Sequence, residues 1–429
     1  MINPIILLLS FLALCLNLDT PSNLSNTSSM MLIGEYFLVV CLASVLTRKF
    51  LPTHSKDIQK RYFNAFLIGL IIALVIMPYT WTPWLNPNYD GWGFDSQRYY
   101  TWAKDYIFYD DLSFMLNGVG VVYFYIFFME IFGVDPLVPL FINSIFCYFA
   151  ILQVANYIGK DNYAFLRYGW LLCLIPELIY FNMMPSRDIL CMAFLTTCVV
   201  HLGTITEKKS KIIALVSFIL LFVIRPTMAL PLIICVILNN LFFGKGGKNN
   251  YLYLIVIIGV VVLMSSVGGL MSSENDLSLS DRVSQAADTT GDLADGATGG
   301  LTNFLTPHNP IEYVVFGTIR SFLYLFISPD MIINPIGSFS VLGEGQAPGL
   351  PNITTLLMFL SIPAMLRLLR HKDYKIDKLR MIFITFCTYF FVVGIFNPHM
   401  IHIRYRVVYD VLFFTLVLYE KKSIIYKNR

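Results

Sequence analysis

The chain has 429 residues, of which 57% are hydrophobic and 13% are charged, and its net charge is +3. A soluble domain carries about 25% charged residues, so too little polar surface remains here to cover a water-soluble globule. These figures exclude a soluble enzyme, a disordered chain and a secreted disulfide scaffold, and the small net charge does not indicate a nucleic-acid partner.

Apolar runs follow one another along most of the chain, and a helix of about 20 such residues crosses a bilayer. The first run lacks the basic start and the small-residue cleavage site of a signal peptide, so we expect a retained helix. The candidate runs are Ile2–Leu18, Met30–Thr47, Tyr62–Thr80, Leu112–Gly133, Leu137–Ile158, Ala164–Asn182, Asp188–Gly203, Lys211–Leu241, Tyr251–Leu270, Ile311–Ile327, Asn352–Leu369, Arg380–Phe396 and Val407–Tyr419.

Short basic loops orient these runs, because such loops stay on the cytoplasmic side. If all the basic loops are cytoplasmic, an even number of membrane crossings must separate any two of them. The sequence instead places an odd number of apolar runs between Arg61 and Lys208, and again between Lys248 and Arg367. One run in each set should therefore not cross, and we nominate Leu112–Gly133 and Ile311–Ile327 as juxtamembrane segments. The basic loops are residues 48–61, 207–211, 244–250, 367–380 and 421–429.

We therefore predict an all-α, polytopic integral membrane protein with about twelve transmembrane helices, plus juxtamembrane helices on the outer side. One membrane domain covers residues 1–429, with two extra spans in 1–61 and a flexible outer loop at 271–310. Lys211–Leu241 is long enough for two helices broken at Arg225–Pro226. The alternative is one kinked helix, which would put the loop after it outside.

The cysteines all lie inside apolar runs, without CxxC or Cys/His metal spacing. We interpret them as small apolar fillers. They are Cys15, Cys41, Cys147, Cys173, Cys191, Cys198, Cys235 and Cys387.

The first group of candidate functional residues follows the third run and includes Asp90, Asp95, Arg98 and Tyr99. A carboxylate at the bilayer surface can deprotonate an acceptor hydroxyl, and Asp95 and Tyr99 share a face if this stretch is helical. Its aromatic residues suit sugar stacking. The plainer reading is an aromatic belt in which Asp95 caps a surface helix.

A second group consists of Arg187 and Asp188, which join two apolar runs at an outer turn. Asp188 is either functional or an N-cap. Further cations lie at the membrane boundary, and arginine binds phosphate in a bidentate manner, so together they indicate a phosphate or pyrophosphate ligand. Each arginine singly has snorkelling to the headgroups as its alternative. These residues are Arg225, Arg320, Arg404 and Arg406, with His399 and His402 nearby.

Motifs for soluble cofactors do not occur: there is no P-loop, no GxGxxG, no HExxH and no GxSxG. We expect no cofactor, and the spacing of the two histidines does not support a divalent metal. An activated donor would more plausibly be presented in the membrane.

Several short motifs together resemble a known family. They are the acidic loop with Asp95 and Tyr99, Phe132-Gly133 before the run Leu137–Asn143, Ile175-Pro176 leading to Ser186-Arg187-Asp188, Arg225-Pro226, and Arg404-Tyr405-Arg406. The chain resembles GT-C-type glycosyltransferases that use polyprenyl-phosphate-linked sugars, particularly bacterial relatives of protein mannosyltransferases and aminoarabinose transferases. It is also similar in character to O-antigen and capsule repeat-unit polymerases.

The resemblance covers residues 62–420 and implies a glycosyltransferase core. It implies Asp95 as catalytic base, Asp188 as the second-loop acid, and Arg225, Arg404 and Arg406 as ligands of the lipid phosphate. The chain departs from the family by its two extra N-terminal spans and by the lack of an Asp-x-Asp pair.

The expected activity is transfer of a sugar from a polyprenyl-(pyro)phosphate carrier to a glycan or lipid-linked acceptor at the outer face of a bacterial inner membrane. The alternatives are a repeat-unit polymerase and, from another class, a lipid-linked oligosaccharide flippase.

Overall fold

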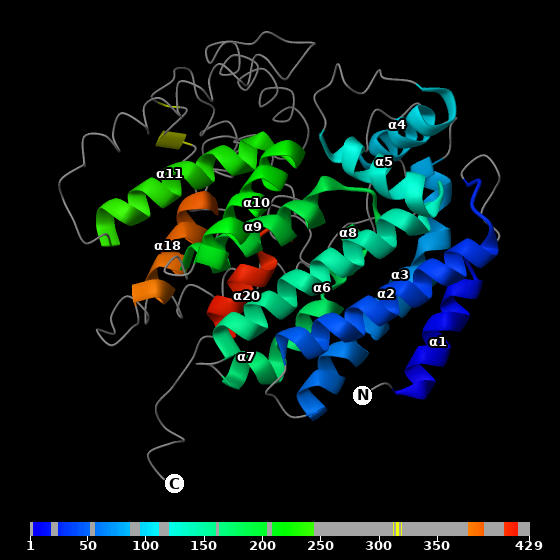
Figure 1. Ribbon diagram of the computed structural model, residues 1–429, viewed down its shortest axis with the longest axis horizontal. Helices are drawn as coiled ribbons and strands as arrows, with labels where there is room; N and C mark the ends of the chain where they lie inside the picture. The colour runs from blue at the N-terminus through cyan, green and yellow to red at the C-terminus, as the bar shows by residue number, and fades with distance from the viewer. Residues whose placement is uncertain are drawn as a thin grey trace, which may run out of the picture.

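The structure is a computed structural model that describes residues 3–18, 25–51, 56–85, 95–110, 120–159, 163–203, 208–243, 376–389 and 407–418, together with four isolated residues between 312 and 319. Every regular element in this part of the chain is helical (Figure 1). The elements are α1 (Pro4–Cys15), α2 (Ser29–Phe50), α3 (Lys56–Leu85), α4 (Asp95–Tyr109), α5 (Gly120–Phe132), α6 (Leu137–Gly159), α7 (Tyr163–Tyr168), the 3-10 helix η2 (Gly169–Leu174), α8 (Pro176–Met183), α9 (Arg187–Gly203), α10 (Lys208–Ile224), α11 (Pro226–Phe243), α18 (Ile376–Tyr389) and α20 (Asp410–Leu418).

Three of these helices, α2, α3 and α6, are long and apolar enough to cross a membrane, and a bent pair formed by α8 and α9 would make a fourth. The all-helical, membrane-type fold predicted from composition is therefore confirmed at this level. Three predicted spans, Tyr251–Leu270, Ile311–Ile327 and Asn352–Leu369, and the loop 271–310 fall largely or wholly outside the described residues.

The long helices α2, α6 and α9 run in the same direction. Asn26 and Val134 exchange backbone and side-chain hydrogen bonds where α2 and α6 begin, and Thr47 contacts the Tyr148 hydroxyl at 2.7 Å further along. Gln153 of α6 donates to Thr197 of α9 at 3.0 Å. Polar contacts of this kind fix the register of helices that otherwise meet through apolar side chains.

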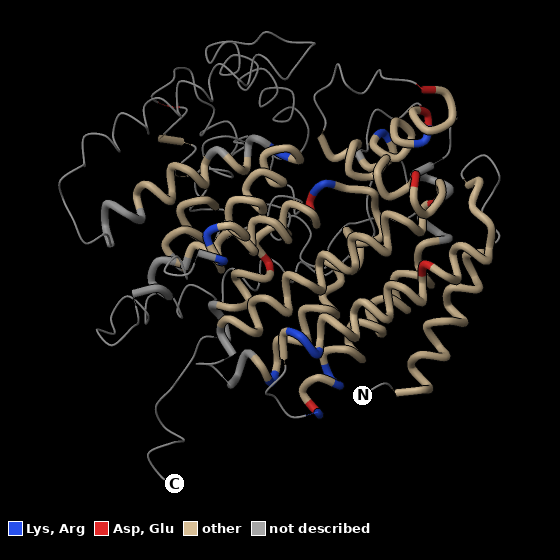
Figure 2. Tube along the Cα trace, in the orientation of Figure 1, with Lys and Arg blue, Asp and Glu red and all other residues tan. Residues whose placement is uncertain are grey.

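The parallel arrangement places the basic turns on one side of the bundle. Arg48 and Lys49 occupy the last turn of α2, and Lys209 and Lys211 lie in the first turn of α10. Figure 2 shows the basic residues at helix ends, while the middle stretches of the long helices are largely free of charge. We call this side the basic end. The two basic turns therefore lie on the same side of the bundle, as the orientation argument assumed.

Helix α5 does not cross the bundle. Its first residue, Gly120, lies against the backbone carbonyl of Val223 near the end of α10, whereas Gly133 after its end lies against Thr27 near the start of α2. Both contacts are at the side opposite the basic end. The 13 residues of α5 span only about 20 Å, less than the bilayer core. The short helix agrees with the prediction that Leu112–Gly133 does not cross the membrane, which stays a prediction.

The run Ala164–Asn182, predicted as one span, is divided into α7, η2 and α8. The break before α8 has a clear cause, because Pro176 lacks an N–H and holds Ile175 extended. At Gly69 of α3 the η2 backbone approaches closely: an added Cβ would lie 2.5 Å from the Cys173 carbonyl oxygen. The irregular segment is thus packed against α3 and α6 instead of facing lipid, where unpaired backbone groups would be costly.

The run Lys211–Leu241 forms two helices, as preferred from the sequence. Helix α10 ends at Ile224 and α11 begins at Pro226. Side chains from the middle of α11 line the same groove as those from the first half of α10, so α11 turns back beside α10. The alternative of a single kinked helix is therefore wrong.

The cysteines are all free thiols, as expected. Cys235 of α11 and Cys387 of α18 lie near each other where these two helices pack together.

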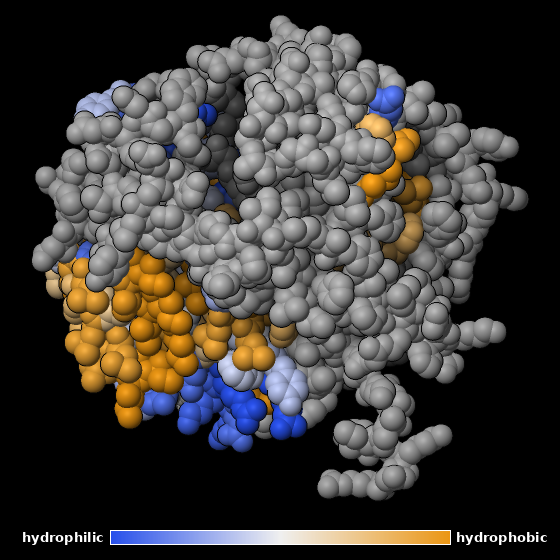
Figure 3. Space-filling model, turned by 180° about the vertical axis from the view of Figure 1, so that it is seen from behind, coloured by the Kyte–Doolittle hydropathy of each residue, from blue (hydrophilic) through white to orange (hydrophobic). Residues whose placement is uncertain are grey.

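Exposed apolar side chains cover the outer faces of α1, α2 and α10. Figure 3 shows a broad apolar area with a hydrophilic border on one face of the molecule. Such a surface suits contact with lipid chains. Helix α1 differs from its prediction, since its 12 residues reach only about 18 Å. The exposed residues include Leu8, Leu12, Phe37, Leu38, Val45, Leu215 and Ile219.

Candidate functional site: a polar centre at a helix break

The chain turns sharply between α8 and α9, whose axes differ by 118°. The turn contains Met184, Pro185 and Ser186, and the proline restricts Met184 to the extended conformation that it adopts. A break of this kind leaves backbone carbonyls without helical partners. Inside an apolar bundle they require other donors.

Side chains from α5 and α6 supply those donors. The Asn143 amide donates to the Met184 carbonyl at 2.7 Å, and the Tyr125 hydroxyl lies 2.8 Å from the Ser186 carbonyl oxygen and 3.2 Å from Asn143 Oδ1. Burial raises the pKa of Tyr125, so its hydroxyl keeps the proton that it donates. The break is therefore a built feature that depends on two other helices.

A buried ion pair lies directly after the break. Arg225 Nη1 is 3.0 Å from Asp188 Oδ1, and their side chains are only 3% and 0% exposed. Asp188 lies in the first turn of α9, and Arg225 is the residue between α10 and α11. Helices α9 and α10 are antiparallel and joined by a short connection, so the start of α9 lies beside the end of α10. This arrangement brings Asp188 and Arg225 together. Burying two charges costs desolvation energy that their attraction only partly offsets.

Helix α4 brings the first acidic loop to the same place. Ser96 Oγ lies 3.8 Å from Met184 Sδ, and the Arg187 guanidinium carbon is 5.9 Å from the centre of the Tyr99 ring. A cation over an aromatic face is an attractive contact. Asp95 is the first residue of α4, so the expected helix carrying Asp95 and Tyr99 is confirmed, although the Asp95 side chain lies outside the described residues.

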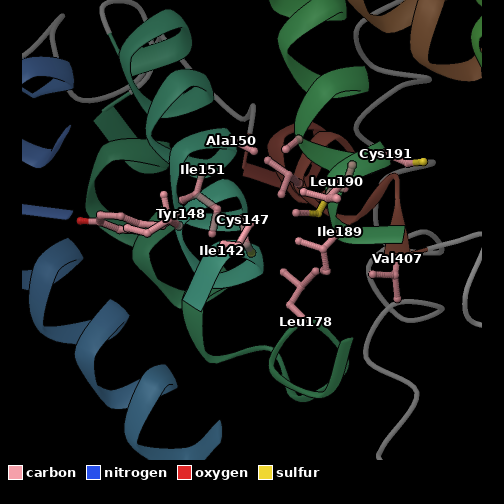
Figure 4. Close-up of a cluster of buried hydrophobic side chains, with 14 of the residues drawn as sticks. Ile142, Cys147, Tyr148, Ala150, Ile151, Leu178, Ile189, Leu190, Cys191 and Val407 are labelled. Carbon is pink, nitrogen blue, oxygen red and sulfur yellow. The ribbon is translucent and has the colours of Figure 1, made fainter. Parts of the chain in front are cut away.

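The late segment of the chain also reaches this region. Val407, Tyr409 and Asp410 are completely buried, and Tyr409 lies close enough to Arg225 for electrostatic interaction. Figure 4 shows the apolar side chains that surround this level of the bundle, from α6, α8 and α9 together with Val407. We call Tyr99, Tyr125, Asn143, Ser186, Arg187, Asp188 and Arg225 the polar centre.

Of the predicted site residues, the structure brings together Tyr99, Arg187, Asp188 and Arg225. It places Arg98 elsewhere: this side chain is exposed and lies 5.5 Å from the Trp102 ring of its own helix. The other predicted residues lie outside the described part of the chain. They are Asp90, Arg320, His399, His402, Arg404 and Arg406.

Tyr125 is absent from the predicted functional residues, and Asn143 and Ser186 appear there only as parts of motifs. The signal for Asn143 is an amide within a long apolar run, which must find a partner in the bundle. Ser186 Oγ is buried and makes no hydrogen bond within the described residues. Tyr125 carries no sequence signal, because its role depends on how α5 lies across the break.

The chemistry available here is anion binding beside a helix terminus. Arg187 is half-buried in the first turn of α9, and arginine and helix N-termini both favour phosphate. Among the described residues there is no group of three or more metal-binding side chains. Comparison with protein-family models, curated proteins and solved structures finds no match to this chain.

Proposed function

We propose that the protein is a membrane glycosyltransferase that moves a sugar from a polyprenyl-(pyro)phosphate carrier to a glycan or lipid-linked acceptor. The reaction takes place at the side opposite the basic end, which faces the periplasm or cell exterior of a bacterial inner membrane. The observation that carries the proposal is the meeting of Arg187, Asp188 and Arg225 with the start of α4 at a broken helix.

The buried pair explains why a phosphate would bind beside an acidic residue. Arg225 neutralises Asp188, so the carboxylate does not cancel the positive potential of Arg187 and of the α9 N-terminus. Arg187 is the more accessible of the two arginines and would contact the phosphate, with Asp188 acting as a positioning residue. Tyr99 beneath Arg187 limits the orientations of the guanidinium.

Sugar transfer then requires a base for the acceptor. The acceptor oxygen forms a bond to the anomeric carbon while the bond from that carbon to the phosphate oxygen breaks. The acceptor proton passes to Asp95, and the carrier leaves as its phosphate, stabilised by the arginines. Asp95 is suited by position, because Ser96 beside it contacts the break.

The test is a complementation experiment in a deletion strain whose surface polysaccharide is displayed on a gel. Asp95→Asn and Arg187→Gln should each abolish or strongly reduce the polysaccharide at normal protein levels. Arg167→Gln is a matched control, because Arg167 is exposed in α7 near the basic end. An unaltered pattern in Asp95→Asn would contradict the catalytic assignment. Accumulation of single-repeat lipid-linked units in the deletion strain would identify a polymerase.

A flippase is the second candidate, and one observation favours it: acidic residues are buried inside the bundle at Glu35, Glu177 and Asp410. Intramembrane acids commonly mark transport pathways, and broken helices are frequent in transporters. An enzyme would convert a lipid-linked donor in detergent solution, where no membrane separates two compartments. A flippase would show activity only in sealed vesicles.

A further inference from the structure

A groove runs between α9, α10 and α11, away from the polar centre and toward the basic end. Its volume is about 290 Å³. Ten residues line it: Cys198, Leu202, Lys211, Ala214, Leu215, Phe218, Leu232, Ile233, Val236 and Ile237. All but Lys211 have apolar side chains, so water gains few hydrogen bonds there, and apolar cavities of this kind take up apolar molecules.

The groove opens toward the lipid. Leu215, which lines it, is 59% exposed, and its neighbours on the same face, Ile212 and Ile219, are 62% and 51% exposed. These residues form a continuous apolar stripe along α10, so the wall of the groove merges with the surface that faces hydrocarbon. The molecule that reaches the groove from this side is a lipid chain.

A positive charge lies at one end. Lys211 is exposed in the first turn of α10, and the residues that follow it up to Ile224 are apolar except for the buried Ser217. Because this end of the bundle also carries Arg48 and Lys49, it meets the membrane surface where lipid headgroups lie. Basic pockets between transmembrane helices on such a side select anionic headgroups.

We propose that this groove binds one anionic glycerophospholipid of the bilayer. An acyl chain lies between α10 and α11, and the phosphate of the headgroup pairs with Lys211. An apolar groove that ends at a lysine complements a molecule with an apolar chain and a phosphate. The described residues leave the space between α9 and α11 open. The bound lipid fills this space and so stabilises the packing of the α10–α11 hairpin against α9.

The test uses the full-length protein, purified and delipidated, with added phosphatidylglycerol or phosphatidylcholine. We expect phosphatidylglycerol to bind about fivefold more tightly, the effect of one lysine near a membrane surface. Lys211→Gln should remove this preference, whereas Lys209→Gln should keep it. Lys209 is the matched control, because it is exposed in the same turn but does not line the groove.

A second variant tests the groove itself. Ala214→Phe should fill it and reduce retention of either lipid in native mass spectrometry. A phosphatidylglycerol with a photoreactive group in its acyl chain should label the wild-type protein on the peptide that contains Phe218 or on the one that contains Val236. This measurement does not depend on whether Ala214→Phe folds. Labelling elsewhere, or an unchanged lipid preference in Lys211→Gln, would overturn the proposal. Loss of a dimer in Ala214→Phe would instead assign the groove to a second copy of the chain.

Discussion

The two ends of the helix bundle hold their charges in opposite ways. At the basic end, Arg48, Lys49 and Lys209 are exposed in helix turns. At the other end, Asp188 and Arg225 are enclosed and pair with each other. Exposed charges are solvated and cost little, whereas enclosed charges must be matched. The difference teaches that the scarce charges of this chain are handled in two ways: they are left exposed at one end of the bundle, and they are enclosed and paired at the other.

The strongest test of this contrast breaks the buried pair. Arg225→Met leaves the Asp188 carboxylate enclosed without its partner, and we expect a loss of about 3–5 kcal/mol in the free energy of unfolding. Thermal unfolding in detergent measures it. The double variant Asp188→Leu/Arg225→Met should be more stable than Arg225→Met alone, because no unmatched charge remains. If the single variant equals wild type, the pair is not enclosed as described.

A smaller loss is expected where α5 lies across the end of α10. Gly120→Ala places a methyl group on the Val223 carbonyl, and overpacking of this kind costs about 1–3 kcal/mol. Gly34→Ala is the matched control, because an added Cβ there meets nothing within 4 Å. We expect that control to be neutral or stabilising, since alanine favours helix over glycine. Equal effects of the two substitutions would place α5 elsewhere.

The Tyr125 hydroxyl should have an effect of about 1 kcal/mol, the usual value of one buried hydrogen bond. Tyr125→Phe keeps the ring and removes the donor to the Ser186 carbonyl. If the polar centre is the site of reaction, activity should fall more than stability, because the break that positions Arg187 becomes looser. Denaturant unfolding and the polysaccharide assay separate these effects. Equal activity at reduced stability would leave Tyr125 a purely structural role.

The membrane-type helical fold was predictable, because composition and long apolar runs determine it with little ambiguity. The shortness of α5 fits the argument from loop charges and parity, which asks for one crossing fewer in this part of the chain. The division of residues 163–183 was harder to foresee. Ile175-Pro176 indicates one break, but the 3-10 geometry of η2 depends on its close approach to Gly69 in α3.

The site was predictable in its residue types and less so in its pairing. Arg187, Asp188 and Arg225 stood out because charges are rare in apolar runs. That Asp188 pairs with Arg225 follows only once α9 and α10 are known to be an antiparallel pair with a short connection. Asn143 and Tyr125 belong to the centre through contacts between helices distant in sequence, which no local pattern encodes.

The smallest effect is expected at the basic end, and it completes the contrast. Lys49→Gln removes an exposed charge, so its unfolding midpoint should stay within about 2 °C of wild type. Its charge matters for orientation instead: replacing Arg48, Lys49, Lys56 and Lys60 together should reduce correct insertion, which a reporter fused after Phe50 would detect. A large loss of stability from Lys49→Gln alone would mean that this end, too, encloses its charges. The distinction between exposed and enclosed charges would then fail.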